Sequence, residues 1–257
     1  MMGPFGDVSV DVHDDFVATV ELHRPPNNHF DIELIRSLAE AFESLDREPG
    51  CRAIVLCSEG RHFCAGADFS GRAGPIGDGS GHLYDEAVRL FAARTPVVAA
   101  VQGAAVGGGL GLAMAADFRV ASPEARFVAN FAQLGFHHGF ALTATLPAVV
   151  GQQHALELLF TGRRVPGEEA LRIGLCDRLV PADRLRGEAQ SLAAEIAASA
   201  PLAVRAIRET MRDDLVGRVR RALDRERAEQ DRLRVTEDFG EGVRATAERR
   251  PPRFTGR

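Results

Sequence analysis

The chain has 257 residues, of which 45% are hydrophobic and 26% charged, so it is long enough to bury a sizeable globular core. Its net charge of -5 argues against a general nucleic-acid binder and against a protein that binds anionic membranes. All 31 basic residues are arginine, so lysine Schiff-base chemistry and lysine-containing phosphate loops are excluded.

The first third of the chain predicts β structure with one helix. Two alternating apolar runs, residues 8–12 and 16–22, indicate a hairpin. A Pro-Pro-Asn-Asn turn follows at 25–28, and Asp31 is a good N-cap for a helix that reaches about residue 47. The short apolar run at 53–57 is typical of a buried strand.

The middle third predicts alternating strands and helices, and therefore an α/β layer with right-handed crossovers. It begins with a glycine-rich segment, residues 71–81, which is either a flexible surface loop or a loop that covers a substrate. The elements expected next are a helix to 93, a strand at 97–101, a turn at 103–109, a helix to 116 and a strand at 118–121.

After residue 150 strands become rare and helices predominate. The last of the expected helices carries a run of Arg, Glu and Asp, which indicates a solvated face with oligomer contacts on the other side. The expected helices lie at 153–161, 167–173, 183–198, 201–213 with Pro201 in the first turn, and then to about 235.

The cysteines and the apolar segments indicate a cytoplasmic protein. No CxxC pair occurs, so reduced, buried thiols are expected at Cys51, Cys57, Cys64 and Cys176. Residues 1–15 contain early acidic residues and no apolar stretch of the kind found in signal peptides. Residues 95–116 are uncharged, but their glycines and proline favour a strand, a turn and a helix over a membrane span.

Two glycine-centred turns are the most informative features. The first is HFCAGAD at 62–68, after the buried strand, and the second is the glycine triplet at 107–109. Free backbone N–H groups at such turns and at a helix start can form an oxyanion hole if two of them point at one atom. Each turn alone is also explained by tight packing, and their spacing does not establish that they meet.

Five motifs carry a family resemblance along nearly the whole chain. They are ELHRPPNNHF at 21–30, RHFCAGAD at 61–68, AAVQGAAVGGGLGLAMAADFRVAS at 99–122, LFTGRRVPGEEALRIGLCDRLVP at 159–181 and TEDFGEGVRATAERRPPRFTGR at 236–257. Together they resemble the enoyl-CoA hydratase/isomerase family, also called the crotonase superfamily. The resemblance implies an α/β spiral of stacked ββα turns at 1–195 and a helical trimerisation region at 196–257.

The resemblance also implies the ligand and part of the site. Acyl-CoA thioesters would bind with coenzyme A as part of the substrate and no further cofactor, in a homotrimer or a dimer of trimers. The N–H groups of Ala67 and Gly108 would hold the thioester oxygen. The CoA channel would be lined by Pro26, Asn27, Ala65, Asp68 and Phe69, with weaker candidates for CoA contacts at Arg249, Arg250 and Phe254.

The chain departs from the family pattern at the catalytic positions. Hydratases of this family use two glutamates, and their positions hold Gly111 and Phe131 here, neither of which can move a proton. The 4-chlorobenzoyl-CoA dehalogenase branch has an aspartate where Gly139 stands. Phe131 and Phe136 suggest an apolar acyl pocket.

Histidines are the first replacements to consider for the missing glutamates, because their pKa lies near neutrality. His137 and His138 lie in the segment that forms the family's active-site wall. His29 and His62 are weaker candidates, and Asp68 is expected to orient its loop. The adjacent pair of histidines lacks a third ligand at a suitable spacing, so no metal site is expected.

Three functions remain open at this point. The first is a lyase or isomerase that stabilises an enolate in the oxyanion hole, with slow or absent ordinary hydration. The second is decarboxylation, isomerisation or thioester hydrolysis through His137 or His138. The third is a non-catalytic acyl-CoA binder, suggested by a retained oxyanion hole without the glutamates.

Overall fold

The computed structural model describes residues 5–68, 77–78 and 81–257. A six-stranded sheet runs through the molecule, with β1 and β2 antiparallel and the remaining neighbours parallel. The strands, in their order across the sheet, are β1 (Val8–Val12), β2 (Val17–Leu22), β3 (Ala53–Ser58), β6 (Val97–Val101), β8 (Phe118–Ala121) and β11 (Arg178–Leu179). The predicted hairpin and the predicted strands at 53–57, 97–101 and 118–121 are confirmed.

Strand β3 shows why this sheet forms the centre of the fold. All of its residues are buried, because successive side chains point to opposite faces and both faces are covered. Val55 and Cys57 pack with α6 (Leu185–Ala197) on one face. On the other face, Ile54 and Leu56 join the larger core that includes α1 (Ile32–Asp46) and α2 (Leu83–Ala92).

Helix α1 begins where the sequence predicts. The Asp31 carboxylate accepts a hydrogen bond from the Leu34 N–H at 2.9 Å, which satisfies one of the free donors of the first turn. The Arg24 guanidinium also lies 2.8 Å from this carboxylate. The cap therefore fixes the start of α1 next to the turn at 25–28.

A second sheet lies beside the first and corrects one prediction. The sequence predicts a single turn over 103–109, but Ala104–Val106 form strand β7 within it. Strand β7 pairs with β9 (Arg126–Val128), which pairs in turn with β10 (Arg164–Pro166). These three residues form a strand because their backbone pairs with β9 on one side and with Cys64 on the other. Neither partner can be recognised from the local sequence.

The helices of the second half follow the prediction with two differences. Helix α4 (Leu142–Thr161) begins well before the expected residue 153 and is bent at Gly151, whose φ of +77° is not helical. Helix α9 (Glu237–Glu248) falls in the region at 196–257 that the resemblance implies to be helical, but the local pattern predicts no helix there, although Thr236 caps it by accepting from Phe239 N–H. The remaining elements are α3 (Gly108–Ala115), α5 (Gly167–Arg172), α7 (Pro201–Met211), α8 (Leu215–Arg234), β4 (Gly77–Asp78), β5 (Gly81–His82) and the short 3-10 turns η1 (Ala132–Leu134) and η2 (Ala182–Arg184).

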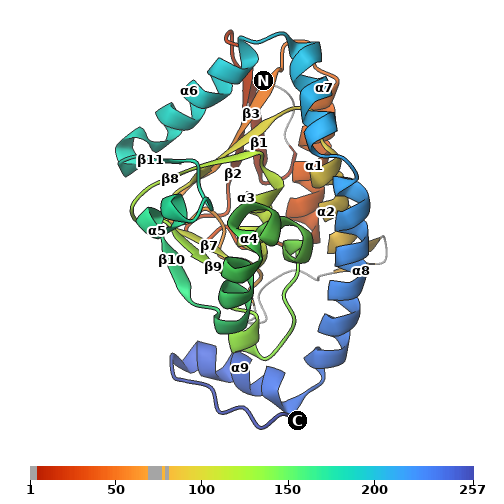
Figure 1. Ribbon diagram of the computed structural model, residues 1–257, viewed down its shortest axis with the longest axis vertical. Helices are drawn as coiled ribbons and strands as arrows, with labels where there is room; N and C mark the ends of the chain where they lie inside the picture. Colours follow the sequence, from red (N-terminus) through yellow and green to blue (C-terminus); the bar gives the residue numbers. More distant parts are fainter. Residues whose placement is uncertain (1–4, 69–76, 79–80) are drawn as a thin grey trace.

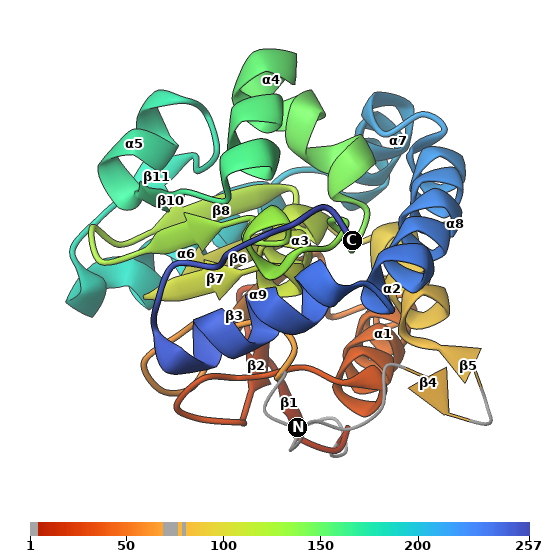
Figure 2. The same ribbon diagram turned by 90° about the horizontal axis from the view of Figure 1, so that it is seen from below.

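The long helix α8 runs along one edge of the molecule and leads into α9, which crosses one end (Figure 1). Helix α8 packs against α2 and α4, and α9 packs against η1. Seen from below, α9 extends across the molecule from the end of α8 (Figure 2). Residue 195, the predicted domain boundary, lies in the last turns of α6, and the division itself stays a prediction.

The four cysteines are free and buried, as expected. Within the described ranges, no helix is long and apolar enough to cross a membrane. Of the predicted loop at 71–81, only residues 77, 78 and 81 are described, and they lie in β4 and β5; the rest falls outside the described residues.

Candidate active site

The two glycine-centred turns lie side by side. Cys64 N–H donates to the Ala104 carbonyl, and Val106 N–H donates to the Cys64 carbonyl, both at 3.0 Å. The packing is so close that a Cβ on Gly109 would lie 2.0 Å from the Cys64 oxygen. Cys64 therefore forms a parallel bridge with Ala105 of β7, which brings the first turn to the start of α3.

Ala67 and Gly108 line the same cavity, which has a volume of about 400 Å³. Neither backbone N–H donates to an acceptor among the residues that the structure describes. Gly108 is the first residue of α3, so its N–H has no partner within the helix. Two backbone N–H groups of this kind on one cavity are the donors that an oxyanion hole requires.

The peptide that joins Gly66 to Ala67 is held from its carbonyl side. The Gly66 oxygen accepts from Phe30 N–H at 3.2 Å and from the His29 Nδ1 at 3.1 Å. Because a carbonyl can only accept, His29 carries its proton on Nδ1 in this contact, and Nε2 of the neutral ring has a free lone pair. Gly66 has a φ of +82°, and a Cβ there would lie 2.6 Å from the Val106 oxygen.

Most of the predicted pocket residues line this cavity, namely Ala65, Ala67, Asp68, Gly108, Phe131 and Phe136. Phe30, Leu83 and Phe140 extend the apolar wall. Phe69 lies outside the described residues. Pro26 and Asn27 are not part of the lining; their carbonyls accept from His62 N–H and Ala65 N–H and so position the first turn.

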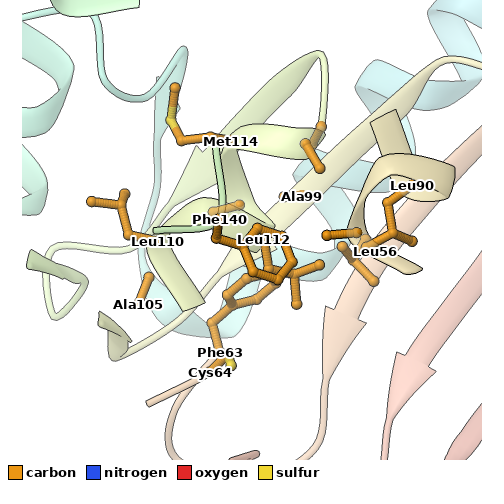
Figure 3. Close-up of a cluster of buried hydrophobic side chains, with 14 of the residues drawn as sticks. Leu56, Phe63, Cys64, Leu90, Ala99, Ala105, Leu110, Leu112, Met114 and Phe140 are labelled. Carbon is orange, nitrogen blue, oxygen red and sulfur yellow. The ribbon is translucent and has the colours of Figure 1, made fainter. Parts of the chain in front are cut away.

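The positions of the missing acids are filled by aromatic side chains. A Cβ on Gly111 would lie 2.5 Å from the Cβ of Phe140, which is only 1% exposed. Figure 3 shows Phe140 within the buried cluster around α3. A Cβ on Gly139 would lie 2.0 Å from the Tyr84 hydroxyl oxygen. The backbone at both positions therefore has no space for an acidic side chain without rearrangement.

His137 and His138 are not among the residues that line the cavity, and their predicted catalytic role stays a prediction. The His138 Nε2 lies 2.8 Å from the Thr143 hydroxyl, and burial lowers the pKa of His138 to about 4. The His137 Nδ1 donates to the His138 carbonyl at 2.8 Å. Next to these histidines, the buried Glu226 carboxylate accepts from the N–H groups of Ala141 and Thr143 at the start of α4.

Sequence reasoning missed five polar residues that line the cavity: Tyr84, Asn130, Gln230, Arg234 and Thr246. The Tyr84 hydroxyl donates to the Gln230 Oε1 at 2.9 Å, and burial raises the pKa of Tyr84. The Gln230 Nε2 donates in turn to the His137 carbonyl at 3.0 Å. Tyr84 and Gln230 are 146 residues apart, and only the rarity of tyrosine in this chain could have drawn attention to either.

The other candidates lie elsewhere. The His62 Nδ1 accepts from Ala104 N–H at 3.1 Å, and burial lowers the pKa of this histidine. Arg250 is paired with Glu241, and neither Arg249, Arg250 nor Phe254 lines the cavity. The CoA contacts predicted for these three residues stay a prediction. Among the described residues, no group of three or more potential metal ligands occurs.

Comparisons with known proteins identify the family of this chain. A family model described as enoyl-CoA hydratase/isomerase matches residues 13–257. A probable enoyl-CoA hydratase of Bacillus subtilis is 33% identical over 95% of this chain and 96% of its own. A 1,2-epoxyphenylacetyl-CoA isomerase of Escherichia coli is 32% identical over 94% and 95%. The crystal structure of an enoyl-CoA hydratase/isomerase from Pseudoalteromonas atlantica has a TM-score of 0.88 and 29% identity, and covers 97% of this chain and 100% of that one.

The fold is thus the crotonase fold that the sequence motifs predict. The chain belongs to the enoyl-CoA hydratase/isomerase family.

Proposed function

We propose that this protein is an enzyme that acts on acyl-CoA thioesters by stabilising an enolate. The observation that carries the proposal is that Ala67 and Gly108 line one cavity and that neither N–H donates to an acceptor in the described part of the chain. Relatives described as a probable enoyl-CoA hydratase and as a 1,2-epoxyphenylacetyl-CoA isomerase support a CoA ester as the ligand.

The chemistry follows from where charge develops. The thioester oxygen accepts both N–H groups, and a proton leaves the carbon next to the carbonyl. The electron pair of that C–H bond moves toward the oxygen, where two prepositioned donors are worth several kcal/mol of barrier. Return of a proton to another carbon gives an isomerase, whereas loss of a group from the neighbouring carbon gives a lyase.

His29 is the proposed proton carrier. It lines the cavity, and its Nδ1 bond to Gly66 leaves Nε2 able to take up the proton. His137 and His138 are not proposed for this step, because neither lines the cavity. The two-glutamate hydration route is not proposed either, since Gly111 and Phe131 carry no acid.

The test is a panel of acyl-CoA esters incubated in heavy water and followed by mass spectrometry. We expect deuterium to enter the carbon next to the thioester, or a rearranged or cleaved product to appear. His29→Gln keeps a donor for the Gly66 carbonyl but cannot take up a proton, so exchange should slow by roughly a hundredfold or more.

His154→Gln is the control, because His154 lies on α4 with its side chain 50% exposed and outside the cavity. Equal exchange in wild type and His29→Gln would remove His29 from the mechanism. Binding of the esters without exchange or product would instead show a non-catalytic acyl-CoA binder.

A further inference from the structure

Arg234 is the only arginine among the described residues that line the cavity. It lies at the end of α8, close to the point where the chain continues into α9 (Figure 2). The surfaces around it are largely apolar, because Leu134, Phe136 and Val243 line the same cavity. A cation in such a wall is costly to keep unless it has a partner.

Arg234 has no carboxylate partner within the described parts of the chain. Three other arginines of α8 do: Arg225 and Arg232 both pair with Glu229, and Arg221 pairs with Asp214. The half-buried Arg234 guanidinium instead faces two aromatic rings, at 5.8 Å from the centre of Phe136 and 5.9 Å from that of Phe239. Cation–π contacts of this length leave the N–H donors of the guanidinium unused.

The neighbouring polar groups are already satisfied by one another. Gln230 lies one turn before Arg234 on the same face of α8, and its amide binds the Tyr84 hydroxyl and the His137 carbonyl. Gln230 and Tyr84 therefore form a fixed polar patch beside the arginine. Among the described residues that line the cavity, the guanidinium of Arg234 is the arginine side chain left to contact a ligand.

We propose that Arg234 recognises a carboxylate on the acyl group, so that the preferred substrate is the CoA thioester of a dicarboxylic acid. A planar guanidinium with free donors matches a carboxylate in a two-point contact. This inference rests on the proposed acyl-CoA function and specifies the substrate class for the same cavity.

The phosphates of coenzyme A are a second source of anionic oxygen. The apolar surroundings of Arg234 favour the acyl group as the ligand, because a phosphate chain retains its water more strongly than a single carboxylate flanked by methylene groups. The two sources differ in one measurable way: a phosphate contact serves every CoA ester, whereas a carboxylate contact serves only the dicarboxylic esters.

Calorimetry with matched esters separates these cases. Glutaryl-CoA and valeryl-CoA have acyl chains of equal carbon number that differ in a terminal carboxylate, and succinyl-CoA with butyryl-CoA and adipyl-CoA with hexanoyl-CoA test shorter and longer pairs. We expect the wild type to bind the dicarboxylic member of the best-fitting pair roughly tenfold to a hundredfold more tightly. Arg234→Met should abolish that preference and leave the affinity for the monocarboxylic member unchanged.

Arg232→Met is the matched control, since Arg232 lies on the same helix, is paired with Glu229 and does not line the cavity. Thermal unfolding of each variant shows whether it is folded. A wild type that prefers the monocarboxylic member of every pair overturns the proposal. Equal weakening of both members by Arg234→Met overturns it in favour of a phosphate contact. A wild type that binds none of the esters overturns the acyl-CoA function itself.

Discussion

Gly111 shows how a single position excludes the usual acid of this family. Its backbone approaches Phe140 so closely that an added Cβ would lie 2.5 Å from the Phe140 Cβ. The sequence alone showed that the acid was missing, but not that its space was occupied, because Phe140 lies almost thirty residues further along the chain. The contact depends on the turn before α4, which no local pattern encodes.

Gly111→Ala should destabilise the fold. Alanine is the better helix former, but overpacking against Phe140 costs about 1 to 3 kcal/mol. Gly187→Ala on α6 is the control, because a methyl group added at that helical position would meet no atom within 4 Å and should gain about 0.5 to 1 kcal/mol. Denaturant unfolding of both variants measures the difference. Equal stabilisation by the two alanines would contradict the packing described at Gly111.

For the candidate histidines, the sequence predicted the position of the segment but not the contacts of the side chains. A family resemblance placed His137 and His138 in the active-site wall, yet their rings bind the His138 carbonyl and Thr143. Sequence position determines which segment forms a wall but not which way each side chain points. The His138 ring, for example, contacts the Thr143 hydroxyl, which itself donates to Glu226, 83 residues further along the chain.

At the scale of elements, Glu226 joins α8 to the start of α4. Its carboxylate is buried and accepts from Ala141 N–H, Thr143 N–H and the Thr143 hydroxyl. Burial raises the pKa of Glu226 from its ordinary value of 4.5 to about 7. The folded protein therefore binds this proton more tightly than the unfolded chain does.

The stabilisation that this proton provides is complete below about pH 4.5 and is lost as the pH rises through about 7. Glu226→Gln cannot titrate, so the free energy of unfolding of the wild type should fall relative to this variant between pH 5 and pH 8, by about 1 to 3 kcal/mol. Urea unfolding of both proteins across this range measures the change. A difference that stays constant with pH would show that Glu226 is ionised throughout.

Elements with strong local signals were predicted well, and those that depend on partners were not. The helix at α1 was predicted because Asp31 caps it and its apolar residues repeat along one face. Strand β7 was missed because three small residues between glycines indicate a turn until Cys64 and β9 supply hydrogen-bond partners. Helix α9 was missed in a segment where only Gly242 and Ala245 are buried, which gives a weak apolar pattern.

At the scale of the whole molecule, helix α7 leaves large apolar side chains uncovered. Leu202 and Met211 are each 80% exposed and Ile207 is 62% exposed. Ile207 and Met211 lie one turn apart on the same side of the helix. Side chains of this kind usually become buried when copies of a chain associate, and the family resemblance leads us to expect a trimer.

Light scattering should therefore give about three times the mass of one chain, or six times for a dimer of trimers. A double variant, Ile207→Glu with Met211→Glu, should shift the mass toward the monomer, because two carboxylates would have to be buried. Gln152→Glu with Gln153→Glu adds the same charge to an exposed part of α4 and should not change the mass. A monomeric wild type would contradict the expectation.

The two glycine turns and most of the apolar residues that line the cavity were predicted from the sequence. The arrangement that encloses the cavity was not, because β7, the end of α8 and the turn before α4 are far apart in the sequence and meet only in the folded chain.

The convergence of the two turns has a further consequence for how this scaffold diversifies. The groups that would stabilise charge are main-chain amides, so they belong to the backbone path and not to any side chain. A change of side chain in the lining, such as at Phe131 or Arg234, alters the wall of the cavity but removes neither amide. The side chains that select a substrate can therefore be varied separately from the main-chain groups that would hold the thioester oxygen.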